Sequence, residues 1–259
     1  MSCPTSYISA EHCCAVPVQG PNICKICHGF AAGRHSLCLS CSKIQLRLGH
    51  SLTRVIPMTL SAPRLDGRAP STARSSVSEL YNVLRCYKWE LPEERLLYNR
   101  VRLASLLVAY LSLHSSCIAQ EFGKLWDLIA IVPSSKGRKN THPLQQVLQH
   151  FELIGSKFSP IVEAGTEHLN HNMASRDGFK ATIETRAIRP CKILLIDDTY
   201  VTGARAQSAA SCLGNCGFNV MAIIAFTRVV NPSFSKGHGD YWRRCYEIRP
   251  QLERCCLES

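Results

Sequence analysis

The stretch KILLIDDTYVTGARAQSAASCLGNCG, residues 192–217, decides how the chain is expected to fold. Its apolar start, extended backwards by Cys191, does not alternate with polar residues, which is typical of a strand buried on both faces. Two adjacent carboxylates, Asp197 and Asp198, end the apolar run, and a Thr/Gly turn then leads into a helix of small residues that stops at Gly217. A strand, a loop and a helix in this order predict one unit of a parallel α/β sheet.

Similar elements flank this unit. Apolar runs at 125–133 and 219–230 predict two more buried strands, and residues 142–155 predict a helix between them. Residues 77–120 have apolar positions at helical spacing, with a break at Pro92. The sequence therefore predicts an α/β fold, an open, mostly parallel twisted sheet with helices on both faces.

Composition limits the class of protein. The chain has 259 residues, of which 46% are hydrophobic and 19% charged, as in an ordinary soluble globular protein. Its longest apolar helix candidate, residues 104–113, is too short to span a membrane, and its start lacks the pattern of a secretory signal, so we expect a cytoplasmic protein without a membrane span. The net charge of +11 favours anionic partners, such as nucleic acid, phosphorylated metabolites or lipid headgroups, although a solvated basic surface is an equal alternative.

The acidic strand end suggests a ligand site. In open parallel sheets, ligands bind beyond the carboxyl ends of the strands, where Asp197 and Asp198 are expected to lie. The following loop offers the hydroxyls of Thr199 and Thr202, close backbone approach at Gly203, and a helix N-terminus that favours phosphate. Carboxylates suit neutral hydroxyls, so a sugar phosphate would satisfy both halves. The alternative is a strand followed by an ordinary turn and a capped helix.

The motif ILLIDDTYVTGAR resembles the phosphoribosyl pyrophosphate (PRPP) loop of the type I phosphoribosyltransferases. The resemblance implies catalytic-site roles for Asp197 and Asp198, which would hold the 2′ and 3′ hydroxyls of the ribose. It also implies that the 5′-phosphate lies in a cradle made of Thr199, Tyr200, Val201, Thr202, Gly203, Ala204 and Arg205.

Two positions depart from the family pattern. Val201 and Arg205 stand where relatives usually carry hydroxyl residues. Val201 also occupies the place of the acid found near the base in 6-oxopurine enzymes, so that chemistry is not supported. Arg205 offers a charge-assisted contact to phosphate in place of a hydroxyl, the alternative being a side chain that faces solvent.

A second loop, IVPSSKGRK at 131–139, follows the first predicted core strand, as the family's pyrophosphate loop does. Magnesium, Mg²⁺, is expected to accompany PRPP and to be held largely by substrate oxygens. The alternative for residues 131–139 is a solvated basic turn. Residues 164–178 resemble the hood that closes over substrate in the family, with Arg176 as its anion-binding candidate, and the alternative for them is an exposed loop. The anion-binding candidates of the second loop are Ser134, Ser135, Lys136, Gly137 and Arg138.

The cysteines predict a separate metal module. Cys24 and Cys27 form one C-x2-C pair and Cys38 and Cys41 another, ten residues apart, at the spacing of a structural Zn²⁺ site. Free thiols are the alternative. A four-thiolate site is closed and is therefore expected to be structural.

The remaining cysteines support weaker expectations. The terminal cysteines raise the hypothesis of a second site that joins the chain ends: Cys13, Cys14, Cys245, Cys255 and Cys256. The others lie in helical or strand patterns and are expected to act as buried small hydrophobic residues: Cys86, Cys117, Cys191, Cys212 and Cys216.

A four-cysteine ribbon before a phosphoribosyltransferase-like domain resembles the ComF family of competence-associated proteins. On this basis we expect a zinc ribbon at 20–45, a linker at 46–76, a phosphoribosyltransferase-like domain at 77–235 and a cysteine-containing tail at 236–259. The family's Arg-Gly-Phe-Asn element is absent, and GRKNTHPL stands in its place, so the acceptor is not specified.

Two functions from different classes follow. The first is a phosphoribosyltransferase that binds Mg–PRPP, or a related sugar phosphate, and transfers the phosphoribosyl group to an unidentified acceptor. The second is a non-catalytic factor for DNA uptake or recombination that uses the fold to bind nucleic acid, DNA-processing proteins or a nucleotide, a PRPP-sensing regulator being a weaker variant.

Overall fold

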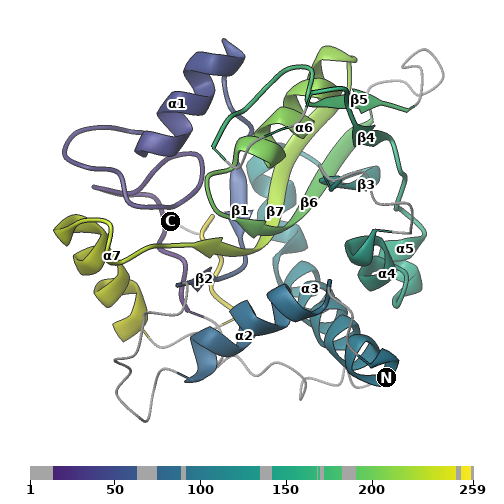
Figure 1. Cartoon of the computed structure of the whole chain (residues 1–259), viewed down its shortest axis with the longest axis horizontal. Helices are drawn as coiled ribbons and strands as arrows, with labels where there is room; N and C mark the ends of the chain where they lie inside the picture. The colour runs from purple at the N-terminus through teal and green to yellow at the C-terminus, as the bar shows by residue number, and fades with distance from the viewer. Residues whose placement is uncertain are drawn as a thin grey trace.

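The computed structural model of the protein shows an α/β sheet with a cysteine-containing module beside it (Figure 1). The described residues are 14–62, 75–88, 92–134, 142–167, 169, 172–182, 191–248 and 252–257.

The sheet is parallel throughout its five strands. Its order is β1 (Val55–Pro57), β7 (Asn219–Val229), β6 (Lys192–Tyr200) and β3 (Leu128–Ile131), and β2 (Leu60–Ser61) pairs with the later part of β7. The predicted parallel α/β fold is confirmed. Strands β1 and β2 lie within the stretch predicted as a linker, so that stretch contributes two strands to the sheet.

The central strand β6 is apolar on both faces because both faces are covered. Ile193 and Leu195 belong to the core cluster that includes α6, whereas Leu194 and Ile196 belong to the cluster that includes α2 and α3. All four side chains are fully buried. Each such burial contributes about 1.5–3 kcal/mol, which explains why the sequence shows a continuous apolar run instead of alternation.

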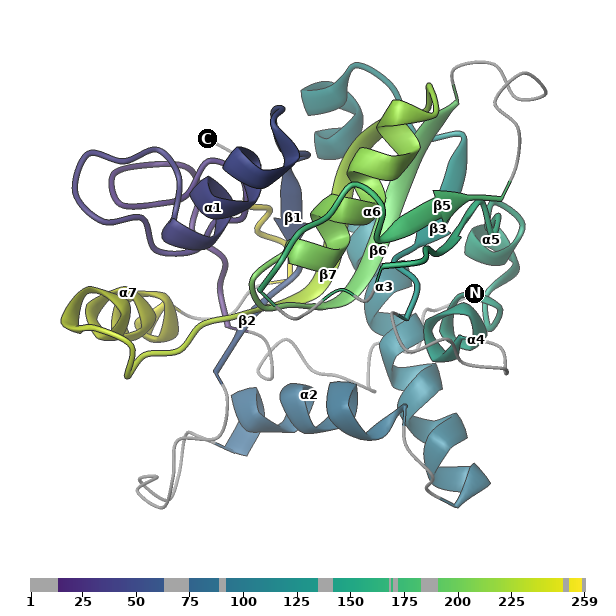
Figure 2. The ribbon, with the colours of Figure 1, turned by 45° about the horizontal axis from the view of Figure 1, so that its top comes forward.

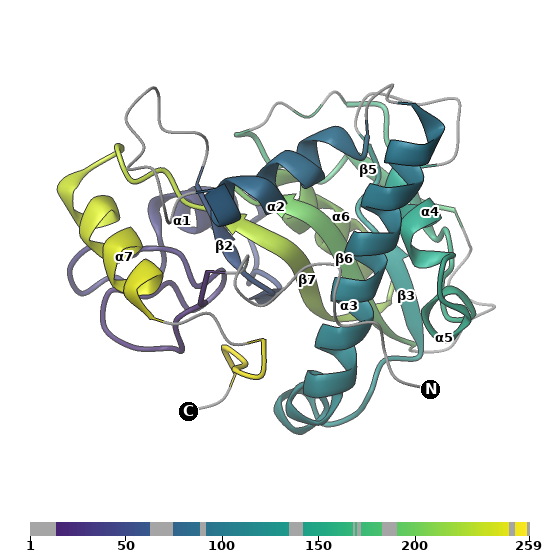
Figure 3. The same ribbon diagram turned by 90° about the horizontal axis from the view of Figure 1, so that it is seen from below.

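Helices α2 (Ser75–Cys86) and α3 (Glu93–Phe122) cover one face of the sheet (Figure 3). The predicted break at Pro92 is confirmed, because Pro92 is the N-cap of α3. The single helix expected at 142–155 is instead two short ones, α4 (Pro143–Leu148) and α5 (Glu152–Gly155). The extended backbone of Phe151, at φ −129°, separates them.

Helix α6 (Ala204–Asn215) covers the other face, with α1 (Leu39–Leu48) beside it (Figure 2). Ala206, Ala209 and Ala210 are buried on α6, and their small size lets the helix lie close to the strands. An antiparallel ribbon of β4 (Val162–Ala164) and β5 (Phe179–Ala181) packs into the same cluster.

The cysteine module is joined to the sheet domain by helix α7 (Lys236–Glu247). A side chain at Gly237 would clash with the ring of Phe30, since an added Cβ would lie 2.4 Å from it. The hydroxyl of Tyr241 donates a hydrogen bond of 2.5 Å to the carbonyl oxygen of His28. The C-terminal helix therefore packs against the loop that carries two of the module's cysteines.

Helix α3 is long and apolar enough to cross a membrane by length and composition, contrary to the shorter apolar stretch expected from the sequence. However, 56% of its most apolar window is buried inside the protein, as in the core helix of a packed domain. Leu103, Leu107 and Tyr110 are among the fully buried side chains that hold it against the sheet.

Candidate functional site

Strand β6 continues beyond the two aspartates, although the sequence suggested that the chain leaves the sheet there. Asp197, Thr199 and Tyr200 still pair with β7, opposite Ala225, Thr227 and Arg228. The β-branched Thr199 and the aromatic Tyr200 suit an extended strand, and the long partner strand β7 provides the ladder. The acidic pair therefore lies inside the paired part of β6, and Thr199 and Tyr200 separate it from the loop to α6.

Asp198 is buried and already has partners from the end of α2. The hydroxyl of Tyr87 donates a hydrogen bond to Oδ2 of Asp198, and Nζ of Lys88 forms an ion pair with the same oxygen. Burial alone would raise the pKa of Asp198, but the charge and hydrogen bond of Lys88 hold it below its usual value. Asp198 is therefore an ionised carboxylate with a fixed counter-ion.

Asp197 has the opposite electrostatic state. Its side chain is partly exposed, and burial together with the charge of Asp198 raises its pKa to about 7, while Arg205 opposes the shift. Two adjacent carboxyl groups with pKa values moved apart are typical of a site where one group holds a charge and the other exchanges a proton.

The turn after β6 is shaped by a buried aromatic ring. Gly203, at φ +87°, starts α6 without a side-chain cap, and an added Cβ there would lie only 2.0 Å from the hydroxyl oxygen of Tyr200. Glycine is therefore required at this position. Tyr200 is fully buried beneath the turn, whereas Val201 is 52% exposed. Of the predicted phosphate cradle, Tyr200 thus supports the loop from below instead of lining it.

Thr202 and Ala204, two further residues of the predicted cradle, lie at the start of α6. Oγ1 of Thr202 accepts a 3.4 Å hydrogen bond from the backbone N–H of Ala204, which is buried. Thr199 and Thr202 are both partly exposed. The start of α6 therefore combines a glycine and a threonine with the backbone N–H groups of a helix N-terminus.

The structure brings the two predicted loops together through Arg205. Its Nη2 donates a 2.6 Å hydrogen bond to the carbonyl oxygen of Pro133, the second residue after the end of β3. Ser134, which follows, is partly exposed. The other members of the predicted second loop, Ser135, Lys136, Gly137 and Arg138, lie outside the described residues.

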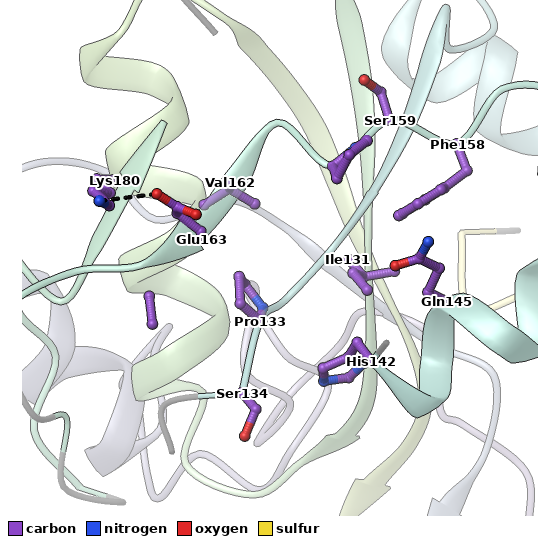
Figure 4. A pocket seen from close by; sticks show the side chains of 12 residues that line it. Ile131, Pro133, Ser134, His142, Gln145, Phe158, Ser159, Val162, Glu163 and Lys180 are labelled. Atoms are coloured by element: carbon purple, nitrogen blue, oxygen red, sulfur yellow. Dashed lines mark ion pairs between the residues drawn. The ribbon is translucent and has the colours of Figure 1, made fainter. Parts of the chain in front are cut away.

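A cavity of about 340 Å³ opens beside Ser134, at the carboxyl end of β3 (Figure 4). Ile131, Phe158 and Val162 supply its apolar wall, and His142 and Gln145 approach from α4. Ile131 lies at the end of β3 and pairs with Ile196 of β6, the residue directly before Asp197. The cavity therefore lies next to the acidic strand end and not at a remote part of the molecule.

The sequence analysis did not identify His142 or Gln145 as cavity residues. His142 is the N-cap of α4, and its Nδ1 accepts a 3.2 Å hydrogen bond from the N–H of Leu144. On the far side, Nζ of Lys180 pairs with Oε1 of Glu163 at 2.9 Å. The sequence did contain a signal for the N-cap role of His142, because a polar residue directly before a helix-starting proline marks a cap.

Arg176 has a different position from that expected of an anion-binding hood residue. Its Nε donates a 2.9 Å hydrogen bond to the carbonyl oxygen of Leu48, at the C-terminus of α1. A guanidinium at this position satisfies a helix carbonyl and complements the helix dipole. The structure therefore does not bring Arg176 together with the acidic strand end.

The four predicted metal ligands form one buried cluster. The Sγ atoms of Cys24, Cys27, Cys38 and Cys41 all lie within 4.8 Å of one another. The Sγ atoms of Cys27 and Cys38 are 3.7 Å apart. A regular tetrahedron with Zn–S bonds of about 2.3 Å has edges of ~3.8 Å. The cluster is thus already close to the size that Zn²⁺ requires.

Local backbone structure positions these sulfurs. Cys38 is the N-cap of α1, and its Sγ accepts a hydrogen bond from the N–H of Cys41. The N–H of Cys24 donates to the carbonyl oxygen of Gly29 at 2.8 Å, which closes the loop around Cys27. Hydrogen bonds from the other three thiols lower the pKa of Cys27, whereas the same contacts raise the pKa of Cys41. Four thiols this close compete for protons, and one divalent cation can take the place of those protons.

Arg228 connects this cluster to the loop after β6. It lies at the end of β7, is buried, and donates from Nη1 to the carbonyl oxygens of Tyr200, at 3.2 Å, and Val201. Burial would lower its pKa, but the neighbouring charges of Cys27 and Cys38 raise it above the usual value. One guanidinium therefore balances the sulfur cluster and fixes the start of the loop. Sequence alone offered no signal for this role, because its partners are distant in the chain.

The terminal cysteines do not converge on one site in the described part of the chain. Cys14 and Cys245 lie in an apolar cluster with Tyr241, while Cys255 lies near His114 and Cys117 of α3. Cys13 lies outside the described residues. The hypothesis of a site that joins both termini is therefore not supported by their positions.

Comparison with known proteins adds no further identification. No protein-family model matches the chain, and no curated protein matches its sequence significantly. What the structure establishes is a parallel α/β sheet with helices and a buried four-cysteine cluster suited to Zn²⁺.

Proposed function

We propose that the protein binds PRPP with Mg²⁺ at the carboxyl end of β6 and transfers its phosphoribosyl group to a small acceptor. One observation carries this proposal. The adjacent Asp197 and Asp198 lie near the carboxyl end of the central parallel strand β6, which ends at Tyr200, three residues before the N-cap Gly203 of α6, and their pKa values are shifted in opposite directions. Such an arrangement suits a diol on the carboxylates and a phosphate at the helix. The resemblance to ComF-type phosphoribosyltransferases supports the same site.

In this proposal the two aspartates have different tasks. Asp198, held as an anion by Lys88 and Tyr87, accepts hydrogen bonds from a ribose hydroxyl and stabilises positive charge at the anomeric carbon. Asp197 has a pKa of about 7. When ionised it accepts a proton from a substrate hydroxyl, and when protonated it donates one. The ammonium group of Lys88 adds attraction for an anionic ligand. Magnesium would supply charge neutralisation of the diphosphate, mostly through substrate oxygens.

The cavity beside β3 is the proposed acceptor site. Its volume of about 340 Å³ suits a single small ring or amine, and its wall is mainly apolar. Ser134, His142 and Gln145 offer hydrogen-bonding groups at one end (Figure 4). Arg205 holds Pro133 at the border between this cavity and the loop before α6. An acceptor there would lie beside a sugar bound over β6.

Calorimetry with Mg–PRPP tests the site. We expect wild-type protein to bind and the double variant Asp197→Asn with Asp198→Asn to lose binding by at least tenfold, about 1.4 kcal/mol. Asp127→Asn is a matched control, because Asp127 accepts a 2.8 Å hydrogen bond from the N–H of Lys192 at the opposite end of the same strands. Equal affinity in the double variant would refute the site. A screen for pyrophosphate release across nucleobases, amines and aromatic acids then identifies the acceptor.

A second candidate function is nucleic-acid binding by the cysteine module, and a specific charge pattern favours it. Residues 14–62 contain five Lys or Arg residues and no Asp or Glu. Four of the basic side chains are exposed, namely Lys25, Arg34, Lys43 and Arg47. A surface of one sign attracts polyanions through counter-ion release.

DNA-binding measurements separate this candidate from the enzyme. Fluorescence anisotropy with single- and double-stranded DNA should show affinity that falls steeply as salt rises. Lys43→Glu with Arg47→Glu should abolish it. Lys124→Glu with Lys236→Glu, which change an exposed lysine after the C-cap of α3 and another on α7, should have a smaller effect. Salt-independent binding would remove the electrostatic basis for this function.

A further inference from the structure

A second group of metal-ligating side chains shares no residue with the two sites described above. Tyr110, His114 and Cys117 are spaced by four and three residues on α3, so they share one face of the helix. Cys255, from the described C-terminal segment 252–257, lies against this face. His114 and Cys255 are 1% and 2% exposed, and Cys117 is half-buried.

The three donor atoms have the spacing of a metal site. His114, Cys117 and Cys255 offer one imidazole nitrogen and two sulfurs, all within 4.8 Å of one another. The distance from Nδ1 of His114 to Sγ of Cys117 is 3.7 Å. Tetrahedral Zn²⁺ with Zn–N near 2.05 Å and Zn–S near 2.3 Å requires a nitrogen–sulfur edge of ~3.6 Å. The observed distance therefore needs almost no adjustment.

The other nitrogen of His114 has the partner that metal-binding histidines usually have. Nε2 lies 2.7 Å from the carbonyl oxygen of Leu252, an acceptor, so Nε2 carries the hydrogen and Nδ1 keeps its lone pair for the cluster. Tyr110 supports the arrangement from one turn below. Its ring centroid lies 4.6 Å from that of His114, and its hydroxyl is 3.8 Å from Sγ of Cys255. The tautomer and orientation of the imidazole are thus fixed from two sides.

We propose that Nδ1 of His114 and the Sγ atoms of Cys117 and Cys255 bind a second Zn²⁺, which fastens the C-terminal segment to α3. One nitrogen and two thiolates suit Zn²⁺ and exclude Mg²⁺ and Ca²⁺, which prefer oxygen ligands. Three protein ligands leave one tetrahedral position for water or an exchangeable ligand. This site is independent of the proposed sugar-phosphate site and of the four-cysteine cluster.

Metal analysis of the full chain tests the proposal. Protein purified under reducing conditions with zinc should contain about two equivalents of Zn²⁺, one for each site. Cys117→Ser and His114→Gln should each lose about one equivalent and keep the other. Cys24→Ser should lose only the equivalent of the four-cysteine cluster. The matched control is Cys216→Ser, which removes a half-buried thiol from the end of α6 and should keep both.

Two further measurements show where the metal acts. After replacement of zinc by Co²⁺, the sulfur-to-cobalt charge-transfer absorption should decrease in Cys117→Ser and not in Cys216→Ser. Hydrogen exchange of residues 252–257 should become at least tenfold faster in Cys117→Ser, because the segment loses its anchor.

The proposal is overturned if the wild-type chain holds only one zinc, or if Cys117→Ser keeps the wild-type metal content. A disulfide between Cys117 and Cys255 in reduced preparations, detected by peptide mapping, would overturn it as well. Because Cys117 is half-buried and serine is close in size, this variant should retain the wild-type circular dichroism spectrum. If it does not, His114→Gln and the Co²⁺ spectrum of the wild type decide the question.

Discussion

The four-cysteine cluster and the acidic end of β6 are both assembled from short sequence motifs, but they differ in how much the motif specifies. In the cluster, all four ligands come from residues 24–41, and the fold brings their sulfurs to within 4.8 Å of one another. At the acidic end, the motif supplies two carboxylates, whereas their charge states depend on Lys88, Tyr87 and Arg205. A local chelating motif therefore predicts its own geometry, while a pair of acids acquires its chemistry from distant elements.

Arg228 joins the two regions, so the effect of a substitution in one region can be measured on the other. It donates to the carbonyls of Tyr200 and Val201 and lies against the cysteine cluster.

Loss of the Zn²⁺ that the four-cysteine cluster is suited to bind should have the largest effect. Cys27→Ser, or chelation of the wild type, should unfold residues 14–48 and release α7 from them, because structural zinc contributes about 10 kcal/mol or more to small sites. Zinc content and limited proteolysis measure this. Cys212→Ser, a buried thiol on α6, should keep its zinc and resist the protease. A Cys27→Ser protein with unchanged proteolysis would show that the cluster does not hold the module together.

Arg228→Met should destabilise both regions at once. The substitution leaves the sulfur cluster without its nearby cation and removes donors from two loop carbonyls, which predicts a loss of about 3–5 kcal/mol in the free energy of unfolding. Urea denaturation measures it, and Arg228→Lys should recover part of the loss. Arg244→Met, on the exposed side of α7, should change stability by no more than about 0.5 kcal/mol. Equal curves for the two Met variants would contradict the connecting role.

Lys88→Met should affect only the acidic end. It leaves Asp198 buried without its counter-ion, which predicts a loss of about 1–3 kcal/mol at neutral pH. The lowered pKa of Asp198 stabilises the wild type above the unfolded value near 3.9, and this contribution disappears as pH falls through the folded pKa. The difference between wild type and Lys88→Met should therefore shrink in acid. Lys180→Met, which breaks an exposed pair with Glu163, should cost about 0.5 kcal/mol or less at every pH.

Asp197→Asn should have the smallest effect on stability, and the effect should have the opposite sign. The pKa of Asp197 is raised to about 7, so the folded state favours the neutral acid, and stability is lost as pH rises from about 4 through 7. The variant should be more stable than the wild type by about 1 kcal/mol at pH 8 and equal to it near pH 4, after allowance for partial solvent exposure. Thermal denaturation at both pH values measures this. A variant less stable at pH 8 would show that Asp197 is an ionised structural partner.

Sequence patterns predicted several elements because the signals were strong and local. The non-alternating run at 192–196 predicted a strand buried on both faces, and the chain places Ile193 and Leu194 in opposite core clusters. The break at Pro92 and the two C-x2-C pairs were equally local. The helix expected at 142–155 was wrong in one respect, since periodicity did not reveal the extended Phe151 between α4 and α5.

The parallel α/β class and the identity of the four clustered cysteines could be predicted from the sequence, because apolar patterns and chelate spacing act within a few residues. Long-range contacts were needed to extend β6 to Tyr200, to place Arg176 at the end of α1, to pair Lys88 with Asp198 and to hold the loop after β6 on Arg228. These features depend on contacts between residues far apart in the chain. Burial and charge act there through space, and no pattern of neighbouring residues records them.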